Sequence, residues 1–301
     1  MNTTIAMLRL MRPANIITAV SDILAGAAIA LFAGNADWRA VPVVSVLLLV
    51  AATAGLYGGG VVLNDVFDAE LDRVERPERP IPSGAIGRGA AALLGAALLV
   101  AGIVAAGFVH RPHWLSASFL LAGAIAVAAV IYDKWGKHHS LAGPLNMGLC
   151  RGLNLLLGMS LLPEALRNYW LLALVPIVYI ASITMVSRGE VHGGSRRTLH
   201  SAVALYAIVA ASIFLISVRN GTWAYALPFL LLFAGMIFAP LRKAIRDPRG
   251  PLIGKAVKAG VIALILMNAA WAAAFGNLPA ALLILALLPL SLGLAKAFMV
   301  T

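Results

Sequence analysis

The chain has 301 residues, of which 61% are hydrophobic and 12% charged, and its mean hydropathy is +0.93. This composition excludes an ordinary water-soluble domain and predicts an all-α polytopic membrane protein. The net charge of +11 does not indicate a nucleic-acid partner, because the basic residues lie in short connections between apolar runs.

Apolar runs long enough to cross a bilayer recur along the chain and predict nine or ten transmembrane helices in one membrane domain, residues 1–301. The first run lacks a small-residue cleavage site and is interpreted as a span rather than a signal peptide. Nine spans with a re-entrant or terminal helix would also fit the pattern. We place the helices at 14–33, 41–63, 90–109, 114–133, 140–162, 169–187, 199–218, 223–241, 256–275 and 279–298.

Lysine and arginine are distributed unevenly between the two sides of these predicted helices. With the N-terminus inside, eighteen of the 23 basic residues fall on one side and four on the other, while Arg151 lies within a span. An excess of basic residues marks the cytoplasmic side of a membrane protein. We therefore expect an integral protein of the bacterial inner (cell) membrane, with polar loops converging on a cytoplasmic active face.

The predicted loop at 64–89 holds six of the twelve acidic residues and directly follows a span. Asn64, Asp68 and Asp72 are spaced i, i+4, i+8, and Asp65 adds an i+3 neighbour, so on a helix they would share one face. Stacked carboxylates repel, and a hard cation such as Mg²⁺ offsets the repulsion while keeping positions for substrate phosphate. The alternative is that these charges form a solvated cap on a cytoplasmic loop.

This acidic pattern resembles the first aspartate-rich motif of the UbiA family of intramembrane prenyltransferases. The matching residues are Asn64-Asp65-x-x-Asp68-x-x-x-Asp72, followed by segment 76–84. Segment 12–15 is similar to the opening of that family, and segment 187–194 is similar to its EboC-like subgroup. The resemblance implies a UbiA-like bundle of nine or ten transmembrane helices around a lipid-accessible cavity that opens toward the cytoplasmic leaflet.

The resemblance further implies a Mg²⁺-dependent transferase that moves an isoprenyl group from an isoprenyl diphosphate to an aromatic or lipid acceptor. Asp65, Asp68 and Asp72 would be the catalytic residues, and together with Asn64 they would hold the metal. Mg²⁺ makes the diphosphate a better leaving group, and apolar walls protect an allylic cation from water. Membrane lipid is a further expected partner.

Asn64 and six basic residues are candidates for diphosphate contacts through charge-assisted hydrogen bonds: Arg76, Arg79, Lys134, Lys137, Arg151 and Arg188. Positive-inside topology alone would also place Arg76 and Arg79 in this loop. For Lys134 and Lys137 the alternative is a topogenic role beside an interfacial aromatic belt. For Arg151, inside a span, the alternative is an internal ion pair.

The chain departs from the resemblance in the loop after the sixth helix, where family enzymes carry a second Asp-x-x-x-Asp cluster. Here the register runs from Glu190 to Gly194, with Glu in one acid position and Gly in the other. Glu190 remains a candidate ligand for a second Mg²⁺, and His192 a candidate ligand or proton acceptor, although Mg²⁺ prefers oxygen ligands. The alternative function is a non-catalytic membrane protein that binds a prenyl lipid or assists export of a small molecule.

Overall fold

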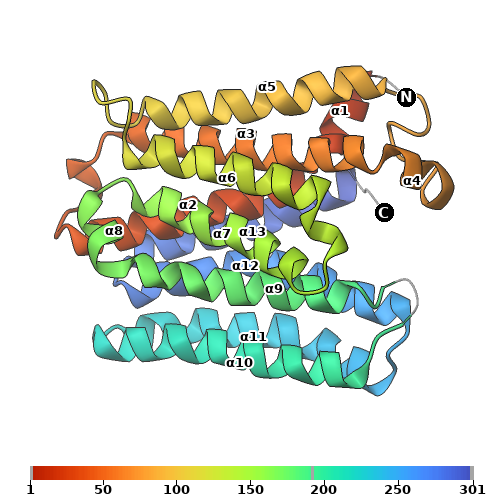
Figure 1. Cartoon of the computed structure of the whole chain (residues 1–301). Helices are drawn as coiled ribbons and strands as arrows, with labels where there is room; N and C mark the ends of the chain where they lie inside the picture. Colours follow the sequence, from red (N-terminus) through yellow and green to blue (C-terminus); the bar gives the residue numbers. More distant parts are fainter. Residues whose placement is uncertain (1–2, 191–192, 299–301) are drawn as a thin grey trace.

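The computed structural model describes residues 3–190 and 193–298. This part of the chain folds into thirteen α-helices and three short 3₁₀ helices, without a strand. The long helices run roughly side by side in one bundle (Figure 1). The predicted all-α architecture is confirmed, and its physical reason is that a helix satisfies its backbone hydrogen bonds internally where water is absent.

The long helices end within six residues of the predicted limits. They are α2 (Pro13–Ala33), α3 (Val43–Phe67), α5 (Arg88–Gly107), α6 (Ala117–Lys134), α7 (Ala142–Met159), α9 (Leu174–Ser187), α10 (Arg196–Arg219), α11 (Trp223–Arg246), α12 (Gly250–Ala274) and α13 (Leu278–Ala297). Short elements outside the predicted helices are α1 (Thr3–Met11), α4 (Ala69–Glu75), α8 (Pro163–Tyr169), η1 (Trp38–Ala40) and η2 (Gly136–His138). The predicted helix at 169–187 begins with a 3₁₀ turn, η3 (Trp170–Ala173), before α9.

Nine helical stretches among the described residues are long and apolar enough to cross a membrane, and α8, η3 and α9 together form one of them, Pro163–Ser187. The remaining long helix, α7, packs against α2, α6 and α9. It falls outside the nine because Asn146, Arg151 and Asn154 lower its hydropathy. The sequence left nine or ten spans open, and α7 is the helix on which that choice depends.

Glycines allow two close helix contacts that position the cavity described below. A Cβ on Gly26 would lie 2.5 Å from the backbone oxygen of Leu155, and one on Gly158 would lie 2.5 Å from that of Ile23. A Cβ on Gly59 would approach the backbone of α5 to 2.7 Å. Because larger side chains would separate these helices, the small residues serve close packing of α2 on α7 and of α3 on α5.

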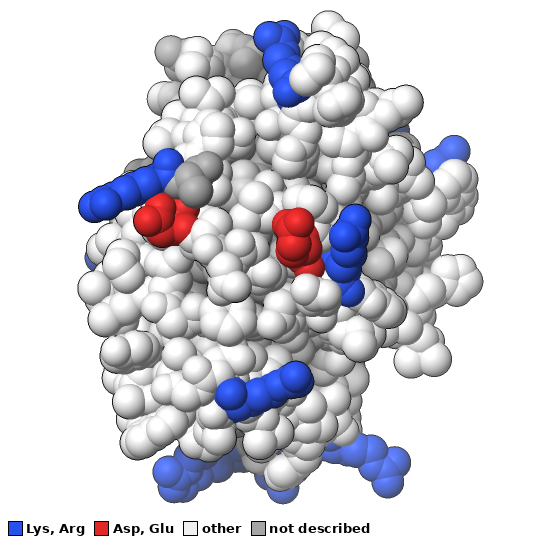
Figure 2. All heavy atoms as spheres, turned by 90° about the vertical axis from the view of Figure 1, so that its left-hand side faces the viewer, with Lys and Arg blue, Asp and Glu red and all other residues white. Residues whose placement is uncertain are grey.

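The two ends of the bundle differ in their charge. The acidic segment with α4 lies at one end, and the α2–α3 and α5–α6 connections lie at the other (Figure 1). Viewed from that second end, the molecule is largely uncharged, with a few scattered basic and acidic side chains (Figure 2). The acidic motif that the sequence analysis selected therefore belongs to the α4 end.

Candidate active site at the end of α3

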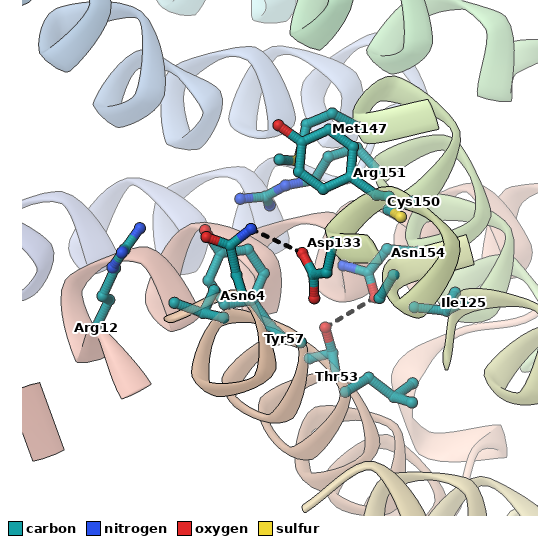
Figure 3. A pocket seen from close by; sticks show the side chains of 15 residues that line it. Arg12, Thr53, Tyr57, Asn64, Ile125, Asp133, Met147, Cys150, Arg151 and Asn154 are labelled. Carbon is teal, nitrogen blue, oxygen red and sulfur yellow. Dashed lines mark hydrogen bonds between the residues drawn. The ribbon is translucent and has the colours of Figure 1, made fainter. Parts of the chain in front are cut away.

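A cavity of about 250 Å³ lies between α3, α6 and α7, with Arg12 at its edge (Figure 3). The α3 residues that line it recur every three or four positions, from Thr53 to Asn64, so one face of this helix forms a wall. Apolar side chains such as Leu56 and Ile125 make much of the surface. The cavity wall is therefore mostly apolar, with polar groups both near the end of α3, at Asn64 and Asp133, and deeper in the bundle, at Thr53, Arg151 and Asn154.

The acidic motif spans the junction between α3 and α4. Asn64 and Asp65 belong to the last turn of α3, Asp68 is the junction residue, and Asp72 lies in α4. The amide of Asp68 donates to the oxygen of Asn64 at 3.0 Å, and the amide of Asp72 to that of Asp68 at 2.8 Å. The motif, predicted to lie in a loop, is thus helical on both sides of Asp68, and helical backbone hydrogen bonds continue across the junction.

Arginines neutralise two of the motif's carboxylates. Nη2 of Arg12 donates to Oδ1 of Asp65 at 2.8 Å. Nη1 of Arg79 lies 2.7 Å from Oδ2 of Asp72 and 3.4 Å from Oδ1 of Asp65. Asp65, Asp72 and Arg79 are all buried, so these pairs are shielded from water. The predicted repulsion between carboxylates is therefore offset within the chain by basic side chains.

Two further contacts connect the end of α3 to α6 and η2. Lys137 forms an ion pair with Asp68, and Nδ2 of Asn64 donates to Oδ1 of Asp133 at 2.9 Å (Figure 3). The other oxygen of Asp133 is buried without a hydrogen-bond partner, as is Oδ2 of Asp65. Asp133 thus adds a fourth carboxylate to the cluster.

The oxygen atoms at the end of α3 are of the type that binds a hard divalent cation. Within 3–190 and 193–298, no three acidic, histidine or cysteine side chains come together as a ready-made metal site. The oxygens present are nevertheless of the kind that Mg²⁺ prefers, and Oδ2 of Asp65 and Oδ2 of Asp133 are buried and unsatisfied. The residues therefore fit Mg²⁺ by chemical type.

Other predicted basic residues make different contacts. Arg188 donates to the backbone oxygens of Ser140 at 2.8 Å and His139 at 2.7 Å, which ties the end of α9 to the η2–α7 connection. Nζ of Lys134 lies 4.4 Å from the ring centroid of Trp135, the contact expected of an interfacial lysine. Neither residue is joined to the aspartates by an ion pair in the described part of the chain.

Glu190 lies just after α9 and lines a second hollow together with Arg12 and Lys258. Burial raises the pKa of its carboxyl group, while the guanidinium of Arg76 acts in the opposite direction. The structure therefore brings Glu190 close to basic residues of the same end of the bundle. His192, predicted as a ligand or proton acceptor, lies outside the described residues.

Arg151 forms the internal ion pair that the sequence left as an alternative. Its Nη1 donates to Oδ2 of Asp22 at 2.8 Å, and Nδ2 of Asn154 donates to the same oxygen at 2.9 Å. Asn268 donates to Oδ1 of Asp22 at 2.7 Å. The Arg151 guanidinium also lies 5.1 Å from the ring centroid of Tyr57 in the cavity wall. Its charge is therefore balanced inside the bundle.

Comparison with known proteins adds to this geometry. A sequence model described as the UbiA prenyltransferase family matches residues 21–253. The chain belongs to the UbiA prenyltransferase family. It is thus a membrane prenyltransferase of isoprenoid biosynthesis, and the predicted enzyme class is confirmed.

Related sequences of this prenyltransferase include digeranylgeranylglyceryl phosphate synthases. The one from Methanothermobacter thermautotrophicus is 27% identical over 259 residues, which cover 81% of this chain and 85% of the relative. The one from Ignicoccus hospitalis is 32% identical over 189 residues, which cover 62% of this chain and 58% of the relative. These relatives give no support to the EboC-like subgroup that segment 187–194 suggested.

Solved structures resemble the prenyltransferase over most of its length. The apo structure of a UbiA homolog from Aeropyrum pernix K1 has a TM-score of 0.69 at 19% identity and covers 85% of this chain and 96% of its own. A UbiA homolog from Archaeoglobus fulgidus bound to GPP and Mg²⁺ has a TM-score of 0.60 at 16% identity, with coverage of 86% and 99%. The predicted UbiA-like helical bundle is confirmed.

Sequence reasoning missed two residues of this prenyltransferase's cluster, Arg12 and Asp133. Arg12 belongs to a segment noted for its family resemblance, but only the fold brings it to Asp65. Asp133 gave one usable signal, since it is an acidic residue in the last turn of an apolar helix. Carboxylates in that position are uncommon unless they have a partner or a function.

Proposed function

We propose that this prenyltransferase moves a prenyl group from a prenyl diphosphate to a hydroxyl group of a lipid acceptor that carries glycerol phosphate, with Mg²⁺ bound at the end of α3. One observation carries the proposal: a cluster of carboxylates and cations lies at the edge of an apolar cavity inside a membrane bundle. A prenyl diphosphate has the complementary form, a charged head on an apolar tail.

The comparisons support both substrates. The relatives named above are digeranylgeranylglyceryl phosphate synthases, which favours a lipid acceptor over the aromatic acceptor that the sequence left open. The Archaeoglobus fulgidus homolog was solved with GPP and Mg²⁺, which supports a prenyl diphosphate as donor and Mg²⁺ as cofactor. Both substrates partition into the bilayer, so access from membrane lipid is expected.

Asp65, Asp68 and Asp72 would hold the metal with the help of Asn64, and Glu190 would contribute to a second site. Bound Mg²⁺ neutralises the diphosphate and improves it as a leaving group. The unsatisfied oxygen of Asp65 supports this role, and the burial of Asp65 and Asp72 keeps the carboxylates in a region of low dielectric, where their attraction to a cation is strong.

Basic residues of the cluster would bind the diphosphate oxygens. Arg79 and Lys137 already contact the aspartates, so their charged groups lie beside the expected position of the diphosphate and can make charge-assisted hydrogen bonds. Arg76, Lys134 and Arg188 lie at the same end of the bundle and would act from further away. Arg151 lines the cavity with its charge balanced by Asp22, so we expect it to bind no diphosphate directly.

In the transfer, the bond between C1 of the prenyl group and the diphosphate oxygen would break, the acceptor oxygen would bond to C1, and the proton of the acceptor hydroxyl would pass to the released diphosphate or to water. Apolar residues of the wall, including Leu56, Ile125 and Met147, would surround the prenyl chain. Their role is to exclude water, which would otherwise capture the allylic cation. Products would be the prenyl ether and inorganic diphosphate.

The orientation and the extent of the domain are part of the same proposal. The end of the bundle with α4 would face the cytoplasm, which the excess of basic residues in the adjoining connections supports. The whole chain, 1–301, would act as one domain in the cell membrane. Labelling of an introduced cysteine in the 76–84 segment with a membrane-impermeant reagent would give protection in intact cells and reaction after permeabilisation.

A non-catalytic prenyl-lipid-binding or export-associated protein is the second candidate function. It is favoured by one observation, that each of Asp65, Asp68 and Asp72 is held by a basic side chain of the chain itself. Gly194 also stands where the family resemblance expects an acid. Such a protein would bind prenyl lipids without releasing diphosphate.

Turnover distinguishes the two candidates. The full chain in lipid nanodiscs is incubated with geranylgeranyl diphosphate and either geranylgeranylglyceryl phosphate or 4-hydroxybenzoate, with Mg²⁺ or with EDTA. We expect Mg²⁺-dependent diphosphate release and a prenylated product, detected by mass spectrometry, with the glycerol-phosphate lipid. Product only with the aromatic acid would overturn the acceptor assignment. Donor binding without release, with either acceptor, would favour the non-catalytic function.

A further inference from the structure

Asp133 lies in the last turn of α6 with its carboxylate in the wall of the cavity (Figure 3). The residue is 4% exposed. Its Oδ1 accepts a hydrogen bond from Nδ2 of Asn64 at 2.9 Å, but its Oδ2 is buried and has no hydrogen-bond partner. One oxygen of this carboxylate is therefore fixed, and the other is available to a ligand.

The surroundings of Asp133 differ from those of the motif aspartates. Asp65, Asp68 and Asp72 each form an ion pair with an arginine or lysine, whereas Asp133 forms none in the part of the chain that the structure describes. Lys137 is near enough to attract the Asp133 carboxylate, but its ammonium group contacts Asp68. Asp133 is thus a buried carboxylate with one neutral partner.

A buried carboxylate in this situation is expected to have a cationic ligand. Removing an ionised carboxylate from water is costly unless a charge or several donors replace the lost hydration. The amide of Asn64 supplies one donor, which leaves most of that cost uncompensated. Oδ2 of Asp65, in the last turn of α3, is likewise buried and has no hydrogen-bond partner. Two carboxylate oxygens, the type of ligand that Mg²⁺ prefers, are therefore unsatisfied in this region.

We propose that Asp133 is a ligand of the divalent cation in this prenyltransferase, and that Asn64 positions it. Asn64 donates to Oδ1 and thereby holds the carboxylate with Oδ2 free, in the manner of the outer-sphere hydrogen bonds that orient metal ligands. The inference rests on the proposed function, since it adds a residue from α6 to the metal site at the end of α3. It also gives Asn64 a positioning role.

Metal binding by the full chain in detergent, without substrate, tests the inference directly. Mn²⁺ serves as the probe, because free Mn²⁺ is quantified by its electron paramagnetic resonance signal. We expect the wild type to bind Mn²⁺, Asp133→Asn to weaken binding about tenfold or more, and Asp133→Glu to retain part of the affinity. Glu164→Gln, which changes an exposed acid of α8, is the matched control and should bind like the wild type.

Thermal unfolding separates a ligand from a residue that only supports the fold. Mg²⁺ should raise the Tm of the wild type, because a ligand that binds the native state stabilises it. Asp133→Asn should unfold no earlier than the wild type without Mg²⁺, since it removes a poorly compensated buried charge, and it should lose the Mg²⁺-dependent rise. A lower Tm with the rise intact would overturn the inference and leave Asp133 a structural role.

The failure of the inference differs from the failure of the proposed function. If the wild type binds Mn²⁺ and releases diphosphate while Asp133→Asn binds Mn²⁺ within twofold of the wild type, only the assignment of Asp133 is wrong. If the wild type neither binds Mn²⁺ nor shows Mg²⁺-dependent diphosphate release, the proposed function and the assignment of Asp133 are both wrong.

Discussion

Arg151 donates a 2.8 Å hydrogen bond to Asp22, a residue 129 positions earlier in the chain, and both side chains are buried in the bundle. The pair joins α7 to α2, and Asn268 extends the contact to α12. Because Arg151 also lines the cavity, the same ion pair fixes one wall of the site. A charge of either sign left alone in this position would have little solvent to stabilise it.

Removing one member of this pair should destabilise the protein. We expect Asp22→Leu to lower the free energy of unfolding in detergent by about 3–5 kcal/mol, because it leaves the Arg151 guanidinium buried and unpaired. The double variant Asp22→Leu/Arg151→Met should recover most of that loss. Equilibrium unfolding in a denaturing detergent, followed by circular dichroism, gives both values. A loss below about 1 kcal/mol for Asp22→Leu would contradict the ion-pair assignment.

The junction aspartate Asp68 offers a sharp test of the metal and diphosphate site. We expect Asp68→Asn to lower Mg²⁺-dependent diphosphate release by about 10²-fold or more while the protein keeps its helical content, because the variant loses a charged oxygen ligand. Glu70→Gln is the control. Glu70 lies two residues away, its side chain is 62% exposed, and its ion pairs among the described residues are with the exposed Arg73 and Arg88. If Asp68→Asn released diphosphate as fast as the wild type, Asp68 would not be a ligand of the metal.

Arg79 bridges two carboxylates and should therefore matter more than its neighbours. Arg79→Ala leaves Asp65 and Asp72 without this partner, and it also removes a candidate diphosphate contact. We expect the Kd for a prenyl diphosphate, measured by titration calorimetry with Mg²⁺ present, to rise about tenfold or more, since hydrogen bonds to charged groups contribute about 1.5–3 kcal/mol. Arg73→Ala, which removes an exposed arginine of α4, should change it less than twofold.

The helix plan and the acidic motif could be predicted from the sequence, and their reasons are local. A run of apolar residues sets the length of a span, and the spacing of Asn64, Asp65, Asp68 and Asp72 is visible in the chain itself. The extension of α3 to Phe67 and the short helix α4 were not predicted, because the many charged residues after position 63 are typical of a loop. Whether the helix at 140–162 is a tenth span stayed open for a related reason, since Arg151 and Asn154 find their partners on other helices.

The partners of the site residues could not be predicted, because they come from distant parts of the chain. Arg12 and Asp65 are separated by 53 positions, and Asn64 and Asp133 by 69. From the sequence alone, Arg12 and Asn64 could equally have faced solvent at the membrane interface, and positive-inside topology explained the arginines equally well. The ion pair of Arg151 was considered as an alternative, but no local pattern selects Asp22 as its partner.

Glu190 should contribute less than Asp68 to donor binding. It is half-buried after α9, and Gly194 supplies no second carboxylate in this loop. We expect Glu190→Gln to weaken Mg²⁺-dependent binding of a prenyl diphosphate less than Asp68→Asn does, with the two variants compared in the same titration. If Glu190→Gln weakened binding as much as Asp68→Asn or more, Glu190 would be as important for donor binding as Asp68, and the prediction would be wrong.

The width of the cavity should determine which donors are accepted. Ala129 of α6 and Gly60 of α3 both line the cavity, and a Cβ on Gly60 would lie only 3.3 Å from that of Ala129. Ala129→Phe should therefore fill space that a prenyl chain needs, and we expect the ratio of kcat/KM for geranylgeranyl over dimethylallyl diphosphate to fall about tenfold or more. Gly123→Val, on the same helix where a Cβ meets open space, is the control and should keep the ratio. If Ala129→Phe has the Tm of the wild type and the kcat/KM ratio is unchanged, the prenyl chain of the donor does not occupy this part of the cavity.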